Sequence, residues 1–172
     1  MKKSKKVFLM AIALGSLTLN PAAFAKATTP QELLADNENG KTINGVNVRK
    51  GTIGAFILNV NGVEELLVRT PYSNEISAFK TSLREAIPAL NAVKLFDLIT
   101  IDEFLNAKHT DGTIHQAKVL VGAFYLQQFP EATTSQRLTI IENLRPHVSK
   151  TVRDELDILC NATLTGMLSR QD

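Results

Sequence analysis

Cysteine is nearly absent from this chain of 172 residues, which contains Cys160 alone. The sequence therefore excludes an intramolecular disulfide and a metal site built from several thiolates. Cys160 lies four positions after Leu156 on an apolar face of a predicted helix, so we expect it to be buried. The alternative is a catalytic nucleophile, which would need a nearby base that the sequence does not reveal.

Tryptophan is absent and tyrosine occurs only twice, which disfavours a protein that stacks sugar rings on aromatic side chains. Four familiar motifs are missing as well: a GxSxG nucleophile elbow, a P-loop, a CxxC pair and an EF-hand calcium loop. We therefore expect no cofactor.

The N-terminus has the layout of a secretory signal peptide. Four lysines among residues 2–6 precede a mostly apolar stretch of 13 residues, Val7 to Leu19, and Pro21 follows it. Ala23 and Ala25 are the small residues that a signal peptidase accepts, so we expect cleavage after Ala25 and export to a periplasm or out of the cell. The alternative, a membrane anchor, requires about 20 apolar residues.

Cleavage would change the charge of the protein. The whole chain has 19 basic and 17 acidic residues, and four of the lysines but none of the acids lie before residue 26. The mature chain would have 15 basic and 17 acidic residues, a net charge of −2. Because it also lacks a basic block, we expect no nucleic-acid partner, and after cleavage no stable membrane anchor.

The mature chain, residues 26–172, predicts one helical domain. Thr29 to Asp36 should form a short helix, and Asn44-Gly45 predicts a tight hairpin between Thr42-Ile43 and Val46–Val48. Thr52 should cap the next helix. Its apolar stripe holds a single polar residue, Glu64, and comprises Ile53, Phe56, Ile57, Val60, Glu64 and Leu67. The alternative at this point is a turn over residues 59–62.

Further helical periodicities follow toward the C-terminus. They predict a helix capped by Ser73 that Pro88 ends or kinks, a deeply buried piece from Leu90 to Ile99, and helices at 101–108, 113–129, 138–144 and from Ser149 onward. Asp154, Glu155 and Asp157 should lie on a solvated face. The expected fold class is mainly α, a single-domain bundle of about six helices with one short N-terminal β-hairpin.

Two stretches, VRKGTIGAFILNV and IPALNAVKLFDLITIDEFL, resemble a family of short uncharacterised bacterial proteins. In that family an RKGT turn enters a helix, and a later helix carries an LFD motif with an acidic-aromatic ending. The resemblance covers about half of the mature chain and implies no activity. The export signal and the C-terminal helical extension depart from the family pattern.

A candidate anion site lies at the start of the helix that follows the hairpin. Arg49, Lys50 and Thr52 would place two cations beside the backbone N–H groups of a helix N-terminus. The alternative is that Gly51 allows a close turn while Arg49 and Lys50 are solvated.

A candidate metal site lies in HTDGTIH, residues 109–115. His109, Asp111 and His115 could approach one ion, with Glu103 as a fourth ligand from the preceding helix. The alternative is a polar loop, in which Asp-Gly forms a turn and Thr113 caps the next helix. The spacing lacks the HExxH signature of zinc helices.

These observations leave two classes of function open. The first is an exported, non-enzymatic module that binds a protein partner or a small ligand, in a groove or between helices. The second is a small metal-dependent hydrolase that uses the segment with His109, Asp111 and His115. We favour the first, because it requires no residues beyond those that the sequence shows. The oligomeric state has no signal in the sequence.

Overall fold

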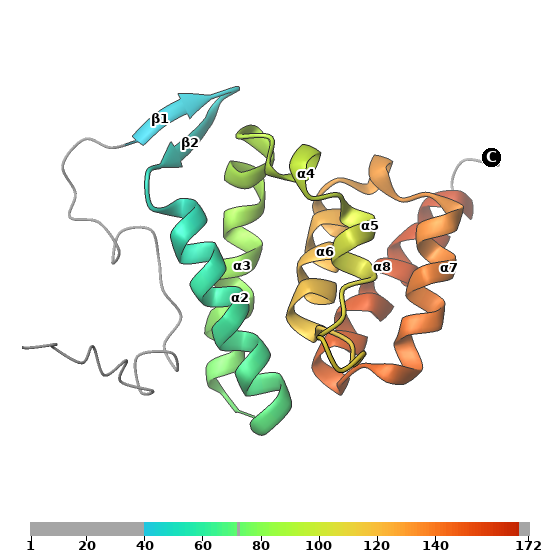
Figure 1. Cartoon of the computed structure of the whole chain (residues 1–172). Helices are drawn as coiled ribbons and strands as arrows, with labels where there is room; N and C mark the ends of the chain where they lie inside the picture. Colours follow the sequence, from blue (N-terminus) through green and yellow to red (C-terminus); the bar gives the residue numbers. More distant parts are fainter. Residues whose placement is uncertain (1–39, 72, 169–172) are drawn as a thin grey trace, which may run out of the picture.

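The protein is a helical bundle with one β-hairpin at its N-terminal side (Figure 1). The computed structural model describes residues 40–71 and 73–168, without the side chains of Lys41 and residues 163–168. The elements in chain order are β1 (Gly40–Ile43), β2 (Val46–Arg49), α2 (Thr52–Arg69), α3 (Glu75–Ala92), α4 (Leu95–Leu98), α5 (Ile101–Leu105), α6 (Gln116–Gln128), a 3-10 turn (Pro130–Ala132), α7 (Ser135–Leu144), a 3-10 turn (Arg145–His147) and α8 (Lys150–Leu168). The predicted fold class is confirmed. The predicted signal peptide and the helix at 29–36 lie outside the described residues.

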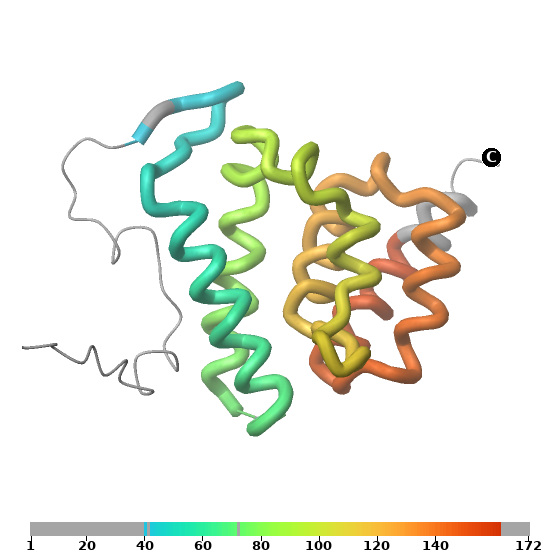
Figure 2. The backbone as a smooth tube through the Cα atoms, in the orientation of Figure 1, coloured from blue at the N-terminus to red at the C-terminus, as the bar shows by residue number. Residues whose placement is uncertain are grey.

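The β-hairpin has the predicted turn. Strands β1 and β2 are antiparallel, and Ile43 pairs with Val46 across Asn44 and Gly45. Both turn residues have positive φ, 48° and 80°. A two-residue turn needs this conformation to match the right-handed twist of the two strands. The hairpin leads directly into α2, which pairs with α3 along its length (Figure 2).

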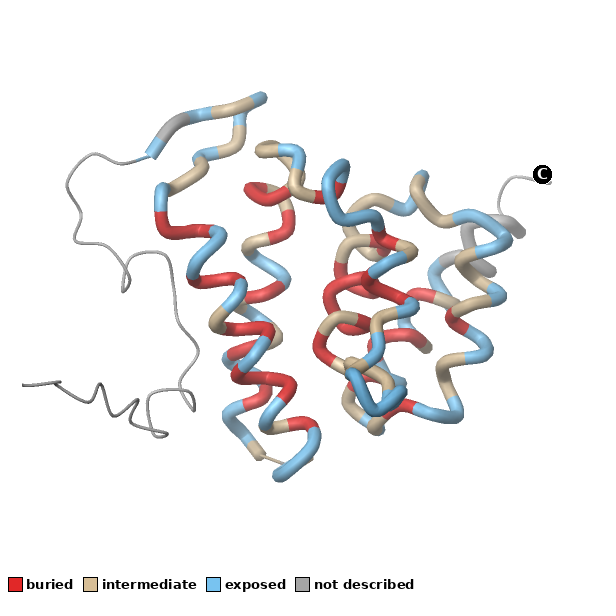
Figure 3. The backbone as a smooth tube through the Cα atoms, in the orientation of Figure 1, coloured by how far each residue is buried: buried red, intermediate tan, exposed pale blue. Residues whose placement is uncertain are grey.

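Helix α6 lies at the centre of the core. Eight of its residues are buried, and this set comprises Ala117, Val119, Leu120, Val121, Gly122, Ala123, Phe124 and Leu126. One hydrophobic cluster includes residues from every helix between α2 and α8, and Figure 3 shows buried segments along α2, α3 and α6. Gly122 permits close approach of α5, because a Cβ there would lie 2.9 Å from Cδ2 of Leu105.

Helix α2 runs unbroken through residues 59–62, so the alternative turn was wrong. Two predictions about its start and its face were also wrong. Gly51 is the N-cap and Thr52 makes no capping hydrogen bond. Ile53 and Ile57 are exposed, because the buried face follows Phe56, Val60 and Val63 instead.

Further predictions were wrong where turn geometry prevailed over periodicity. Of the two alternatives at Pro88, an end of the helix was wrong, because α3 continues past Pro88 to Ala92, and the chain then turns at Lys94, whose φ is 64°. The segment that follows is not deeply buried: Phe96 is, but Leu98 is 80% exposed and Ile99 is 43% exposed. Thr113 does not start a helix, since α6 begins at Gln116.

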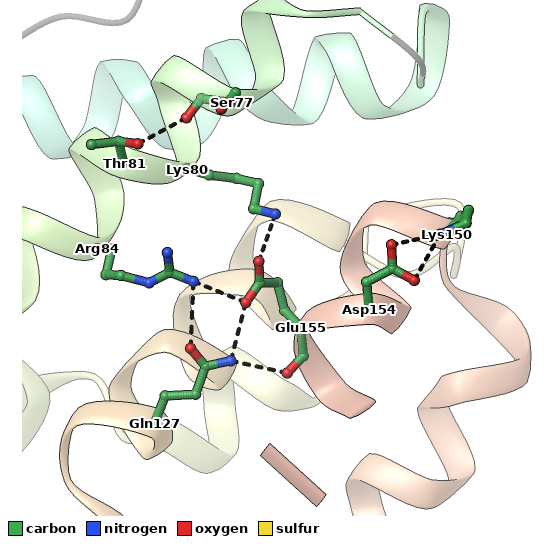
Figure 4. A network of polar contacts seen from close by, with 8 residues as sticks. All are labelled: Ser77, Lys80, Thr81, Arg84, Gln127, Lys150, Asp154 and Glu155. Carbon is green, nitrogen blue, oxygen red and sulfur yellow. Dashed lines mark hydrogen bonds and ion pairs between the residues drawn. The ribbon is translucent and has the colours of Figure 1, made fainter. Parts of the chain in front are cut away.

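A buried ionic network connects α3, α6 and α8 (Figure 4). Glu155, expected in solvent, is only 3% exposed. Its carboxylate pairs with Lys80 at 2.5 Å and Arg84 at 2.9 Å, and it accepts a hydrogen bond from Gln127 at 3.1 Å. The Arg84 guanidinium also lies 4.3 Å above the centre of the Phe124 ring. These contacts explain how a charge is accommodated on the inner side of α8.

Candidate metal centre

The connection between α5 and α6 is a tight hairpin rather than a helix start. We call residues 107–115 the histidine hairpin. Lys108 and Ile114 form a β-bridge, and the His109 N–H donates to the Thr113 carbonyl oxygen at 2.8 Å. The tip turns at Gly112, whose φ of 85° suits glycine.

Asp111 holds the tip of the histidine hairpin in shape. Its Oδ1 accepts hydrogen bonds from the backbone N–H of Thr113 at 2.9 Å and from the Thr113 hydroxyl at 2.6 Å. These bonds lower the pKa of the Asp111 carboxyl below its ordinary value. Asp-Gly turn chemistry, as the sequence indicated, therefore builds a hairpin and not a helix cap.

The histidine hairpin brings its two histidines together. Their rings are stacked, with centroids 4.5 Å apart and planes 12° from parallel. His109 pairs with Thr113 across the hairpin, so His115 is its diagonal neighbour on the same face. The side chain of His115 is 13% exposed and that of His109 is 37% exposed.

Both rings contact one buried carboxylate, Glu64 of α2. Nε2 of His109 lies at hydrogen-bond distance from Oε1, 2.9 Å, and Nδ1 of His115 lies 3.0 Å from Oε2. The Ala117 N–H, in the first turn of α6, donates to Oε2 at 2.6 Å. Glu64 therefore links α2, the histidine hairpin and the N-terminus of α6, where the helix dipole favours a negative charge.

The electrostatics of Glu64 keep it ionised. Burial alone raises the pKa of its carboxyl, but the contacts from His115, the Ala117 N–H and His109 outweigh burial and lower the pKa to about 2. A buried carboxylate that stays charged well into the acid range can be either the centre of a structural hydrogen-bond cluster or a ligand for a cation.

One nitrogen in this cluster lacks a good hydrogen bond. Nδ1 of His115 is close to Glu64 but poorly aligned, and within the described residues this buried atom has no hydrogen-bond partner. Native proteins rarely leave a buried polar atom unsatisfied, so each such atom needs an explanation. When it carries no proton, that nitrogen can donate its lone pair to a metal ion.

Glu64, His109 and His115 form a three-donor set, which we call the His-Glu cluster. One ligand atom from each lies within 4.8 Å of the others. Donors on a tetrahedral zinc ion lie about 3.3 Å apart, as follows from ligand distances of about 2.0–2.1 Å. Nε2 of His109 lies 2.9 Å from Oε1 and Nδ1 of His115 lies 3.0 Å from Oε2, so the side chains must shift for one oxygen and both rings to hold one ion.

The structure brings together two of the four predicted metal ligands, His109 and His115, and adds Glu64. Glu103 instead completes a capping box, because its Oε2 accepts from the N–H and hydroxyl of Thr100. Asp111 is engaged in its turn. Glu64 was not predicted as a ligand, because it is distant from the histidines in the chain and lies 45 positions before His109. Its one signal was a lone charge within an apolar stripe, which should be paired when buried.

At the predicted anion site, the start of α2 differs from the expectation. Thr52 is 4% exposed and does not cap α2, while Lys50 is exposed.

Cys160 is a half-buried free thiol, and burial raises its pKa. The raised pKa opposes the thiolate form that a nucleophile needs.

Comparisons with known proteins assign no function. No protein-family model matches the chain, and neither a curated protein nor a solved structure matches it. Within residues 40–71 and 73–168, every helix is too short or too polar to cross a bilayer. The site must therefore be interpreted from its own geometry.

Proposed function

We propose that this protein is an exported, non-enzymatic binding module whose ligand at the His-Glu cluster is a transition-metal ion, with zinc as the best fit. The observation that carries the proposal is the convergence of Glu64, His109 and His115, with one donor atom from each within 4.8 Å of the others. Two imidazoles and a carboxylate are ligands that zinc accepts in tetrahedral sites.

The surroundings of the cluster support a positioned ligand set. Glu64 is anchored through Oε2 by the Ala117 N–H, which leaves Oε1 to face a cation. His109 and His115 are held by backbone bonds within the hairpin, and the Asp111 turn fixes its tip. Ligands that are oriented by their own hydrogen bonds bind metal more tightly than loose ones.

The alternative is a metal-dependent hydrolase. Three protein ligands leave a coordination position for water, and His109 is accessible enough for a substrate to approach. Hydrolysis also needs a group that takes a proton from that water. Among the described residues no further histidine, cysteine, aspartate or glutamate belongs to the cluster, so we propose binding rather than catalysis.

Export remains part of this proposal and is supported by the N-terminal sequence alone. The family resemblance likewise depends only on the two quoted motifs and assigns no activity. A protein partner stays an open part of the proposal.

Calorimetric titration of the metal-free protein with zinc tests the proposal. We expect one site, and loss of affinity by about 100-fold or more in Glu64→Gln and His115→Ala, since even an outer-shell partner of a ligand is worth roughly 10- to 100-fold. Glu64→Gln keeps an oxygen for the Ala117 N–H and so separates loss of the charge from loss of the fold. Circular dichroism before each titration verifies that the variant is folded.

Two variants serve as matched controls for the ligand set. Glu103→Gln and Asp111→Asn alter the two other carboxylates that the sequence proposed. Since Asp111→Asn keeps an oxygen that can accept from Thr113 and hold the turn, we expect both variants to bind zinc like the parent. If these variants lose zinc while Glu64→Gln retains it, the metal site is the one expected from sequence. If all variants and the parent fail to bind, the His-Glu cluster is a structural contact and the proposed function is wrong.

A further inference from the structure

The far side of the histidine hairpin forms one wall of a pocket. Side chains alternate between the two faces of extended chain, so the bridge partners Lys108 and Ile114 face away from His109 and His115. The histidines face α2, and Lys108 and Ile114 line a cavity that α7 closes on its other side. Figure 1 shows the connection between α5 and α6 lying between α2 and α7.

This cavity, which we call the α7 pocket, has a volume of about 580 Å³ and opens to solvent. Pockets for small molecules commonly measure about 300–1,000 Å³. Its apolar part consists of Ile114, Ile140 and Leu144, all half-buried. These three side chains offer a surface to an aliphatic or aromatic body a few carbons long.

The polar part of the α7 pocket has one sign of charge. Lys108 and His147 stand at its edge with the amide of Asn143, and none of the lining residues is acidic. Within the described part of the chain, Lys108 makes no ion pair, as is also true of Lys50 and Lys118, whereas Lys80, Lys94 and Lys150 each pair with a carboxylate. The nearest acid in sequence, Asp111, is occupied by Thr113 and does not line the pocket.

We propose that the α7 pocket binds a small organic acid, whose carboxylate lies between Lys108 and His147 and whose apolar body covers Ile114 and Leu144. A lysine ammonium recognises a carboxylate by charge-assisted hydrogen bonds, and an amide at the rim adds a neutral donor. Apolar burial supplies the rest of the affinity. This site is separate from the His-Glu cluster and requires no metal.

Titration of the purified protein with octanoate tests the proposal. Amide NMR shifts are recorded at each step, in the presence of a chelator. The chelator prevents a bound metal from holding the carboxylate, so the result is independent of the proposed metal binding. We expect saturable shifts confined to residues 106–114 and 140–147. Octylamine has the same chain with a cationic head, and we expect it to cause no saturable shift there.

Charge reversal at Lys108 provides the decisive comparison. We expect Lys108→Glu to weaken octanoate binding by about tenfold or more, since a charge-assisted hydrogen bond is about twice as strong as a neutral one and the reversed charge repels the ligand. Lys50→Glu makes the same change at the anion site proposed from sequence and should leave binding unchanged. If Lys108→Glu does not fold, Lys108→Met, which keeps the aliphatic stem, takes its place. Absence of saturable octanoate binding, equal binding of octylamine, or loss in Lys50→Glu alone would overturn the proposal.

Discussion

The imidazole rings of His109 and His115 are stacked 4.5 Å apart at their centroids, although six positions separate them in the chain. A helical start at Thr113 would have pointed them in different directions. The hairpin makes them diagonal neighbours on one face of extended chain instead. Both rings then meet the same carboxylate, Glu64, which a distant helix supplies. The proposed metal site depends on this hairpin geometry.

The shape of the histidine hairpin can be tested at Gly112, whose φ is 85°. We expect Gly112→Ala to lower the free energy of unfolding by about 1–2 kcal/mol, the cost of left-handed backbone for a residue with a Cβ. Zinc affinity should also fall, because the distorted tip displaces both histidines. Urea unfolding and zinc calorimetry measure the two effects.

Gly45→Ala is the matched control. Gly45 lies in the β1–β2 hairpin and has a φ of 80°, and a Cβ added there would also meet open space. We expect a similar loss of stability with unchanged zinc affinity. Equal loss of zinc affinity in both variants would show that general destabilisation, not the position of the histidines, controls metal binding.

The ionic network around Glu155 should make stability depend on pH. Burial alone raises the pKa of Glu155, but the contacts with Lys80, Gln127 and Arg84 lower it below the ordinary value of 4.5. Since the folded pKa is depressed, the stabilisation is fully present above about pH 4.5 and is lost as the pH falls through the folded pKa. We expect Glu155→Gln to lower the free energy of unfolding by about 1–3 kcal/mol at pH 7. The difference from the parent should shrink in acid.

Asp154→Asn is the comparison for this network. Asp154 pairs with Lys150 on the surface of the same helix, and exposed pairs of this kind contribute about 0–1 kcal/mol. Urea unfolding at several pH values between 7 and 2.5 gives both results. A loss in Glu155→Gln that stays constant over this range would contradict the assignment of stability to the charged network.

The close contact of α5 with α6 predicts the effect of a single methyl group at Gly122. A Cβ there would lie 2.9 Å from Cδ2 and 3.2 Å from Cγ of Leu105, which is fully buried. Alanine gains about 1 kcal/mol of helix propensity over glycine, whereas overpacking costs about 1–3 kcal/mol. We expect Gly122→Ala to lower the midpoint of thermal unfolding.

A double variant separates overpacking from other causes. Leu105→Ala removes the side chain that Gly122→Ala would strike, so the two substitutions together should cost less than their sum. Additive losses would mean that the two residues do not compete for space.

Local chemistry in the sequence predicted several elements correctly. Asn44-Gly45 marked the turn between β1 and β2, and Thr100 with Glu103 marked the capping box that starts α5. Each depends on residues within a few positions of one another, where geometry is set by the chain itself. The same local reasoning failed at Thr113, because the Asp111-Gly112 turn competes with a helix cap there and the flanking residues do not alternate like strands.

The candidate site could be predicted only in part. The two histidines were visible as a pair, but Glu64 comes from α2 and is joined to them only by the packing of α2 against α6. Burial was likewise misjudged at Leu98, which is apolar and 80% exposed, because neighbouring elements decide which face is covered. A lone charge on an apolar face was the one sequence feature that pointed toward the missing ligand.

Anomalous diffraction at the zinc absorption edge, from crystals grown with zinc, shows directly whether an ion binds at the His-Glu cluster. We predict one strong peak about 2.0–2.1 Å from Nε2 of His109, Nδ1 of His115 and Oε1 of Glu64. A peak at Glu103 or Asp111, or a hairpin without any peak in which both histidines still contact Glu64, would contradict it.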